Sequence, residues 1–239
     1  MKILGIIPAR GGSKGVPQKN IKILNGKPLI WYTHQASKAS KLLSRTIVSS
    51  EDKNILDVCN SIGMDIPFVR PQNLANDKTP TIDVIFHALK KIEELGEQYD
   101  AVCLLQVTTP FRTPQLIDDA IRQFIKKKPD SLISVKRIPD EYSPLWAFKD
   151  EGNELLSPFY EQRFIATRRQ DLINAYYRDG SVYITNSNVI KNMSMYGNTI
   201  SYILNENIYH VNIDTISDWE KAKKISSHID NKYYKNDND

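Results

Sequence analysis

A run of glycines and cations follows directly after the first apolar segment of the chain. Residues 3–7 are apolar, which is typical of a short buried strand. The loop that follows combines glycines with cationic and hydrogen-bonding side chains: Arg10, Gly11, Gly12, Ser13, Lys14, Gly15, Lys19 and Asn20. Glycines allow backbone N–H groups to turn toward one point, and the cations add fixed positive charge. The segment therefore predicts a polyphosphate-binding loop at the carboxyl end of a strand, where open α/β sheets place their ligands.

The spacing of this loop excludes the two commonest phosphate-binding motifs. A Walker A loop requires Gly-x-x-x-x-Gly-Lys-Ser/Thr, whereas here Lys14 precedes Gly15. A dinucleotide fingerprint requires Gly-x-Gly-x-x-Gly, whereas Arg10 occupies the first glycine position. Pro17 disfavours a helix at Val16, so we expect loop amides and side chains, rather than a helix end, to hold the phosphates. A merely flexible glycine turn is the alternative, but it would not account for the cations.

Two further polar segments follow predicted strands and should meet the same edge of the sheet. In residues 70–81, Arg70 is a candidate for phosphate or ribose, and the hydroxyl group of Thr79 or Thr81 for a base. Asp77 and Lys78 are as well explained as solvated side chains.

In residues 104–112, Gln106 can donate and accept hydrogen bonds at once, which suits a sugar or the edge of a base. Thr108 and Thr109 are either part of this site or simply the turn that ends the strand.

The sequence Asn212-Ile213-Asp214 places two polar side chains on one face of an extended segment, because side chains alternate. A carboxylate beside a triphosphate is a suitable ligand for Mg²⁺, which prefers hard oxygens. Asp214 could instead cap the next helix. The adjacent pair Arg168-Arg169 suggests an anionic ligand, although surface arginines are common.

The elements that position these residues alternate along the chain. We expect strands near 2–7, 45–49, 66–69, 100–106, 131–136, 181–185 and 208–213, and helices near 28–40, 51–62, 81–95, 114–127 and from Thr215 onward. This alternation predicts an α/β fold with a mostly parallel sheet. Residues 137–177 break the rhythm and are expected to form a lid, an oligomer contact or both. The polar tail, residues 229–239, is expected to be disordered.

Composition narrows the class of protein further. The chain has 239 residues, which suffice for one sizeable α/β domain, and its formal net charge of +4 includes no long basic block that would indicate nucleic acid. No apolar stretch approaches the roughly 18 residues of a membrane span, so we expect a cytoplasmic protein without a membrane partner. Cys59 and Cys103 lie in apolar segments and are expected to be reduced thiols in the core.

Taken together, these motifs resemble the N-acylneuraminate cytidylyltransferases, or CMP-sialic acid synthetases, including bacterial relatives that act on legionaminic or pseudaminic acid. The resemblance runs in family order up to about residue 228 and rests on ARGGSKG (residues 9–15), RPQNLAND (70–77), LQVTTPFR (105–112), RRQD (168–171), DGSVYI (179–184) and IDT (213–215). The first motif is shared in part with the octulosonate cytidylyltransferases, and RRQD speaks against that alternative.

The resemblance implies a single Rossmann-like nucleotidyltransferase domain over residues 1–228, a homodimer, and the substrates CTP and a nine-carbon 2-keto acid sugar, with Mg²⁺ as cofactor. It implies the following site residues by matching position: Arg10, Ser13, Lys19 and Asn20 on CTP; Arg70, Thr79 and Thr81 near the nucleotide; Gln106 and Tyr183 facing the sugar; and Asp214 on Mg²⁺. As a cation of the same loop, Lys14 is also expected to bind the phosphates. Arg10, Lys19 and Arg169 would serve catalysis, with Arg169 reaching the partner's site and the sugar carboxylate as one candidate contact.

Three residues depart from the family pattern. Asn212 replaces the first aspartate of the usual Asp-x-Asp metal pair, Asp179 replaces a usual asparagine, and Trp146 stands where a sugar-contacting lysine can occur. The last two leave the identity of the sugar open. Two other classes also remain to be tested: a nicotinamide-dependent dehydrogenase, which Arg10 and Pro17 argue against, and a non-catalytic nucleotide-binding regulator, which a weakened metal pair would favour.

Overall fold

A six-stranded sheet forms the centre of the molecule. The computed structural model describes residues 1–160 and 166–229. The sheet has the order β10 (Ile200–Leu204), β6 (Ser131–Arg137), β9 (Tyr176–Asn186), β5 (Ala101–Leu104), β1 (Ile3–Pro8) and β4 (Arg45–Ser49). Strand β9 is antiparallel to both of its neighbours, and the other pairs are parallel. The mostly parallel α/β fold is thus confirmed, while the reversed strand was not predicted.

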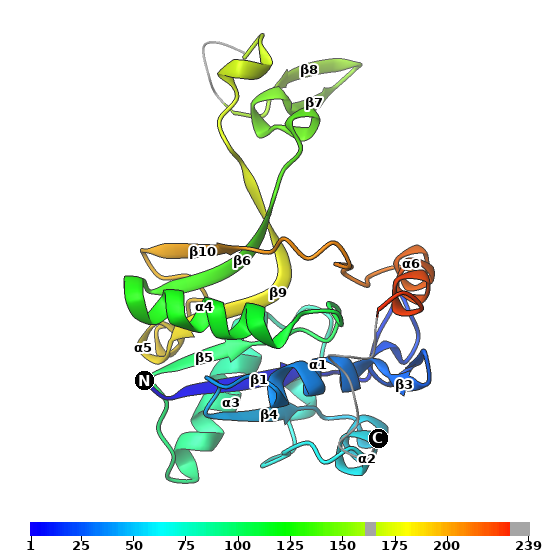
Figure 1. The fold of residues 1–239 in the computed structure, drawn as a ribbon, viewed down its shortest axis with the longest axis vertical. Coiled ribbons are helices and arrows are strands. Elements are labelled where there is room, and N and C mark those ends of the chain that lie inside the picture. The colour runs from blue at the N-terminus through cyan, green and yellow to red at the C-terminus, as the bar shows by residue number, and fades with distance from the viewer. Residues whose placement is uncertain (161–165, 230–239) are drawn as a thin grey trace.

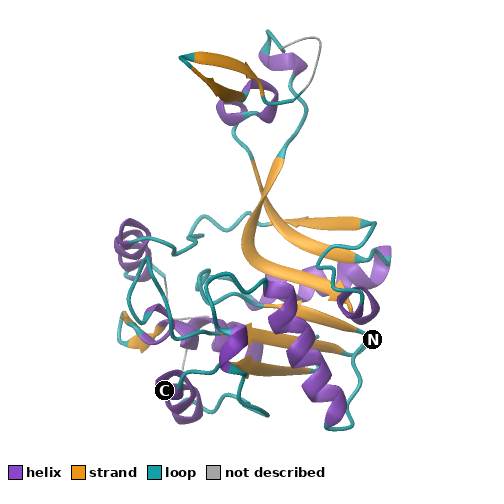
Figure 2. Cartoon of the chain, turned by 180° about the vertical axis from the view of Figure 1, so that it is seen from behind, coloured by secondary structure: helices purple, strands orange, loops and turns teal. Residues whose placement is uncertain are grey.

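Helices cover both faces of this sheet (Figure 2). One face packs against α1 (Leu29–Lys38), α2 (Lys53–Ser61), α4 (Pro114–Lys127) and α6 (Ile216–Ser226), and the other against α3 (Thr81–Glu94) and the short α5 (Ser187–Lys191). The alternation of side chains along β1 produces the two cores, because Ile3 and Ile7 enter the first and Leu4 and Ile6 the second.

The predicted helices are confirmed to within a few residues because local signals start them. Asp52 caps α2 by accepting a hydrogen bond from the Ile55 amide at 3.0 Å, and Thr113 caps α4 through the Leu116 amide at 3.1 Å. Helix α6 begins with a complete capping box formed by Thr215 and Asp218.

Two predicted strands are wrong. Near 66–69 only an isolated bridge between Asp65 and Ile47 forms, and Pro67 lacks the N–H group that would continue a ladder. Residues 208–213 form a loop, and the edge strand is instead β10. The Asn207 amide bonds to the Asn205 side chain at 3.0 Å, and the Tyr209 amide to the Asn207 side chain at 2.9 Å. These local bonds take up donors that a sheet would use.

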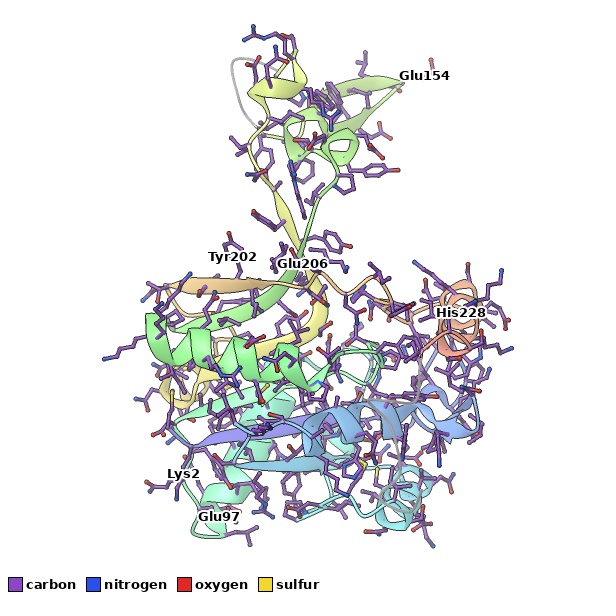
Figure 3. The ribbon with its side chains drawn as sticks, viewed as in Figure 1. Lys2, Glu97, Glu154, Tyr202, Glu206 and His228 are labelled. Carbon is purple, nitrogen blue, oxygen red and sulfur yellow. The ribbon has the colours of Figure 1, made fainter. Side chains whose placement is uncertain are left out.

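Residues 138–160 and 166–175, which we call the arm, extend away from the body between β6 and β9 (Figure 1). The arm contains a hairpin of β7 (Phe148–Gly152) and β8 (Leu155–Pro158), which was not predicted. In Figure 3, Glu154 lies at its far end, whereas Tyr202 and Glu206 lie on the body near its base. The irregular segment predicted at 137–177 is therefore a projection with its own small sheet. Apart from Ile229, the tail prediction falls outside the described residues.

The two cysteines are unpaired and buried, as expected. Burial raises the pKa of both the Cys59 and the Cys103 thiol to about 12, so they are inert core residues. None of the described helices combines the length and the apolar character needed to cross a membrane.

The imidazole of His87 on α3 generates a prediction about pH. Its ring packs edge-on against Phe68 with centroids 5.3 Å apart, and neither ring nitrogen has a hydrogen-bond partner among the described residues. Burial lowers the pKa of His87, and likewise the pKa values of His34 and His210. The unfolded chain therefore binds more protons than the folded chain below about pH 6.5.

We expect the free energy of unfolding to be retained above about pH 6.5 and to fall as the pH is lowered from there. His87→Phe keeps a ring against Phe68 and removes one titrating group, so its free energy of unfolding should depend less on pH. Urea unfolding at pH 8 and pH 5.5 measures both chains. An equal pH dependence in the two would show that His87 is not desolvated in the folded protein.

Candidate functional site

A polar cleft of about 420 Å³ opens at the carboxyl ends of β1 and β5. It brings together predicted residues from four separate segments of the chain: Arg10, Ser13, Lys14, Lys19, Asn20, Arg70, Thr79, Thr81, Gln106 and Asp214. The cleft thus lies at the edge of the sheet that the sequence predicted.

A second cleft of about 480 Å³ adjoins the first. It contains Tyr183 and Asn212, which the sequence predicted, and it shares a wall with the first cleft formed by Thr81, Gln106, Thr108 and Asp214. Two ligands bound in the two clefts would meet at this shared wall. The arrangement therefore suits a reaction between two substrates better than the binding of a single small molecule.

The glycine loop is packed tightly against the backbone at residues 213–214. A Cβ atom added to Gly15 would lie 1.9 Å from the carbonyl oxygen of Asp214, so only glycine fits. The Lys19 ammonium group donates to the Ile213 carbonyl at 2.6 Å and lies 3.5 Å from the Asp214 carboxylate. Burial lowers the pKa of Lys19, and Asp214 opposes this shift. These contacts hold the cationic loop beside the Asp214 carboxylate.

A second set of contacts shapes the loop from the other side. Asn20 donates its side-chain amide to the Arg10 carbonyl at 2.9 Å, and the Gly11 amide donates to Glu51 at 2.8 Å. The other Glu51 oxygen accepts from the guanidinium of Arg70, and both side chains are buried. Arg70 thus lines the cleft while it is held by Glu51. Sequence reasoning missed Glu51, although an acidic residue directly after a strand at this edge was a usable signal.

Asp77 forms ion pairs with two cations of the glycine loop. Its two carboxylate oxygens lie 2.9 Å from the Arg10 guanidinium and 2.5 Å from the Lys14 ammonium group. The hydrogen bond from Lys14 is the main reason that the pKa of Asp77 is lowered. The sequence left open whether Asp77 is merely solvated, and the structure places it in the first cleft. An incoming anion would exchange with this internal carboxylate.

A buried arginine fixes the backbone that carries Gln106. The guanidinium of Arg112 donates to the Gln106 carbonyl, to the Thr109 hydroxyl at 2.6 Å and to the Ser181 carbonyl at 2.8 Å. Thr109 in turn donates to the Gly180 carbonyl at 3.0 Å. Of the two threonines left open by the sequence, Thr108 lines both clefts and Thr109 links the loop to β9.

The donor set at residues 212–214 fits a magnesium ion. Asp214 has a side chain that is 63% exposed, and one of its oxygens accepts from the Asn212 amide at 2.7 Å. No group of three or more histidine, cysteine or acidic side chains that could hold a metal occurs in the described part of the chain. One carboxylate and an amide oxygen, completed by substrate phosphates and water, is a common magnesium environment. Zinc, which prefers nitrogen and sulfur ligands, fits this donor set poorly.

Asp179 faces the interior although it borders the second cleft. Its carboxylate accepts hydrogen bonds from the Ser134 hydroxyl, the Ser181 amide and the Asn205 side chain. Burial acts to raise the pKa of Asp179, but these hydrogen bonds outweigh it and lower the pKa. The aspartate that departs from the family pattern is thus a satisfied structural anion. Burial also raises the pKa of Tyr183, in the same cleft, to about 12.

Arg169 is the one predicted site residue that the structure leaves outside both clefts of its own chain. It lies in the arm, 79% exposed, and its guanidinium pairs with Asp140 at 2.6 Å. Arg168 pairs in the same way with Asp171 at 2.8 Å. Trp146 is also in the arm, where its indole N–H donates to the Ala166 carbonyl at 2.6 Å.

Comparison with known sequences gives consistent results. The profile of the cytidylyltransferase family matches residues 4–238. The CMP-N,N'-diacetyllegionaminic acid synthase of Legionella pneumophila is 34% identical over 229 residues, which cover 94% of this chain and 96% of that protein. A pseudaminic acid cytidylyltransferase of Campylobacter jejuni is 33% identical over 226 residues, covering 93% and 95% of the two chains.

Comparison with solved structures agrees on the fold. A CMP:2-keto-3-deoxy-manno-octonic acid synthetase complexed with CTP superposes with a TM-score of 0.73 at 16% identity, covering 95% of this chain and 99% of that one. The 4-diphosphocytidyl-2C-methyl-D-erythritol synthase of Anaerococcus prevotii superposes with a TM-score of 0.64 at 13% identity, covering 95% and 96%.

The contact between Gly15 and Asp214 can be tested by a matched pair of substitutions. Gly15→Ala should lower the free energy of unfolding by about 1–3 kcal/mol, because the added methyl group meets a backbone oxygen. Gly12→Ala is the control, since nothing lies within 4 Å of its added Cβ, and it should change stability by less than about 0.5 kcal/mol. Urea unfolding measures both. Equal losses in the two variants would contradict the packing described here.

Proposed function

Because the chain belongs to the cytidylyltransferase family, we propose that it activates an acidic nine-carbon 2-keto sugar, namely sialic, legionaminic or pseudaminic acid, with CTP. The products would be the CMP-sugar and pyrophosphate. The single observation that carries the proposal is the wall shared by the two clefts, which offers a place where the two substrates meet. The substrates named for the Legionella and Campylobacter relatives support the choice of sugar class.

In the proposed reaction, CTP occupies the first cleft and the sugar acid occupies the second. The anomeric hydroxyl of the sugar attacks the α-phosphorus of CTP; an oxygen–phosphorus bond forms, the bond to the β-phosphate oxygen breaks, and the hydroxyl proton passes to solvent. No protein nucleophile is required. Arg10, Lys14 and Lys19 stabilise the charge that develops on the α-phosphate and the leaving pyrophosphate.

The remaining residues act mainly by positioning their ligands. Gln106 on the shared wall orients the sugar hydroxyl toward the nucleotide, and Tyr183 forms part of the sugar cleft. Ser13, Asn20, Thr79 and Thr81 offer hydroxyl and amide groups to CTP. Bound at Asp214 and Asn212, Mg²⁺ would neutralise phosphate charge and hold the phosphate oxygens in place.

The arm is proposed to join two chains into a homodimer. Its described part exposes large apolar side chains that a monomer would leave in water: Leu155 at 64%, Leu156 at 66%, Phe159 at 54% and Ile173 at 69%. A second copy of the chain would cover them and bring Arg169 to the site of the partner subunit. Residues 1–228 would then form one catalytic domain per chain, acting in the cytoplasm, where CTP is supplied.

Pyrophosphate release tests the proposed function directly. The protein is incubated with CTP, Mg²⁺ and, separately, sialic, legionaminic, pseudaminic and octulosonic acids. We expect release with at least one nine-carbon acid, and none without sugar or with ATP in place of CTP. Release of pyrophosphate with octulosonic acid alone would show that the substrate is an eight-carbon and not a nine-carbon sugar acid. No release with any acid, together with binding of CTP, would indicate a nucleotide-binding regulator.

Arg10 should be essential to this activity. Removing a cation that stabilises the transition state costs about 2–4 kcal/mol, so Arg10→Ala should lower kcat/KM roughly 30- to 1000-fold. Arg122→Ala is the control, because Arg122 is an exposed residue of α4 outside both clefts and pairs with Asp119 in a surface contact. Steady-state assays compare the two variants. A loss of kcat/KM below threefold in Arg10→Ala would show that Arg10 does not stabilise the transition state.

Asn212→Asp should restore a second carboxylate beside Asp214 and therefore lower the Mg²⁺ concentration at half-maximal activity. The control is Asn54→Asp on the exposed surface of α2, which adds the same charge away from both clefts. Titration of activity with Mg²⁺ measures the effect. The same midpoint in Asn212→Asp and in the unmodified protein would place Asn212 outside the metal site.

A further inference from the structure

The second cleft contains one cation among its described lining residues, Arg178 of β9. Among the described residues, its guanidinium makes one hydrogen bond, to the Tyr196 hydroxyl at 3.3 Å, and no carboxylate lies within ion-pair distance of it. This sets Arg178 apart from the arginines that do pair with a carboxylate: Arg10, Arg45, Arg70, Arg122, Arg137, Arg168 and Arg169.

The two acidic residues in the described lining of the second cleft, Asp179 and Asp214, do not neutralise Arg178. Asp179 is next in sequence, but its side chain is fully buried and its carboxylate is directed at Ser134, Ser181 and Asn205. Asp214 lies on the wall shared with the first cleft, where Lys19 and Asn212 contact it. The second cleft therefore presents an uncompensated positive charge to any ligand it binds.

An irregularity in the pairing of β9 with β6 places the Arg178 side chain at the cleft. Arg178 pairs with Val135 of β6, and Tyr183 pairs with Ile133, so a step of five residues along β9 corresponds to a step of two residues along β6. Gly180, within the irregularity, has a φ of +84°, which favours glycine. A bulge of this kind redirects side chains at a site. As a result, Arg178 and Tyr183 line one cleft together with Tyr196.

We propose that Arg178 binds the carboxylate of the sugar acid and thereby makes the second cleft specific for acidic sugars. The inference rests on the proposed function. In a 2-keto acid sugar, the carboxylate and the attacking hydroxyl are attached to the same carbon. A guanidinium that forks onto the carboxylate therefore also fixes the hydroxyl near the shared wall. Arg178 belongs to the chain that binds CTP, so this recognition does not depend on the arm of a partner.

The test compares each sugar acid that supports turnover with its C1 alcohol, in which a neutral CH₂OH group replaces the carboxylate. Calorimetry measures the affinity of the unmodified protein, Arg178→Gln and Arg178→Lys for both compounds. The unmodified protein should prefer the acid by about 10- to 100-fold, the range expected for hydrogen bonds between charged groups. In Arg178→Gln this preference should fall below about threefold, and Arg178→Lys should retain part of it.

Kinetics supply a second readout. Arg178→Gln should raise the KM for the sugar while leaving the KM for CTP within about twofold, because the residue lines only the second cleft. Arg122→Gln is the control and should change neither KM, because Arg122 is exposed on α4, lies outside both clefts and pairs with Asp119. If Arg178→Gln still prefers the acid to the alcohol as strongly as the unmodified protein does, the inference is overturned. The proposed reaction is tested separately, by the activity of the unmodified protein. Loss of the preference in Arg169→Gln instead would assign the carboxylate to the arm.

Discussion

The close packing of the glycine loop on the backbone at residues 213–214 is the constraint on which the site depends. Gly15 has no room for a side chain beside the Asp214 carbonyl, and the Lys19 ammonium group binds the neighbouring Ile213 carbonyl at 2.6 Å. These two contacts join the first loop of the chain to a segment nearly two hundred residues later. Because of them, the cations that suit phosphates and the carboxylate that suits a metal lie at one place.

The cations of the first cleft are paired with carboxylates of the protein before any ligand binds. Asp77 bridges Arg10 and Lys14, and Glu51 binds Arg70 while it accepts the Gly11 amide. A triphosphate that displaces Asp77 gains the loop cations in an arrangement that Glu51 and Asn20 already hold, so little reorganisation is needed at the moment of reaction. The second cleft contrasts with the first, because its single cation has no carboxylate partner among the described residues.

Local signals made much of the fold predictable. The apolar periodicity located the helices, three of which begin at the local caps Asp52, Thr113 and Thr215, and the glycine loop located the first cleft. The reversed strand β9 and the edge strand β10 were missed, because pairing between distant segments leaves no local pattern. The counter-ions Glu51 and Asp77 were missed or left open for the same reason. The structure of a single chain does not test the role expected for Arg169, since that role depends on what the arm contacts.

The most direct test of the central claim is a crystal structure of the protein with a non-hydrolysable CTP analogue and Mg²⁺. We expect the triphosphate to lie against residues 10–20 and to replace Asp77 as the partner of Arg10 and Lys14, and we expect the metal ion to contact the Asp214 carboxylate. The α-phosphorus should face Gln106 and the second cleft. A nucleotide bound elsewhere, or bound with its phosphates directed away from the glycine loop, would contradict the account.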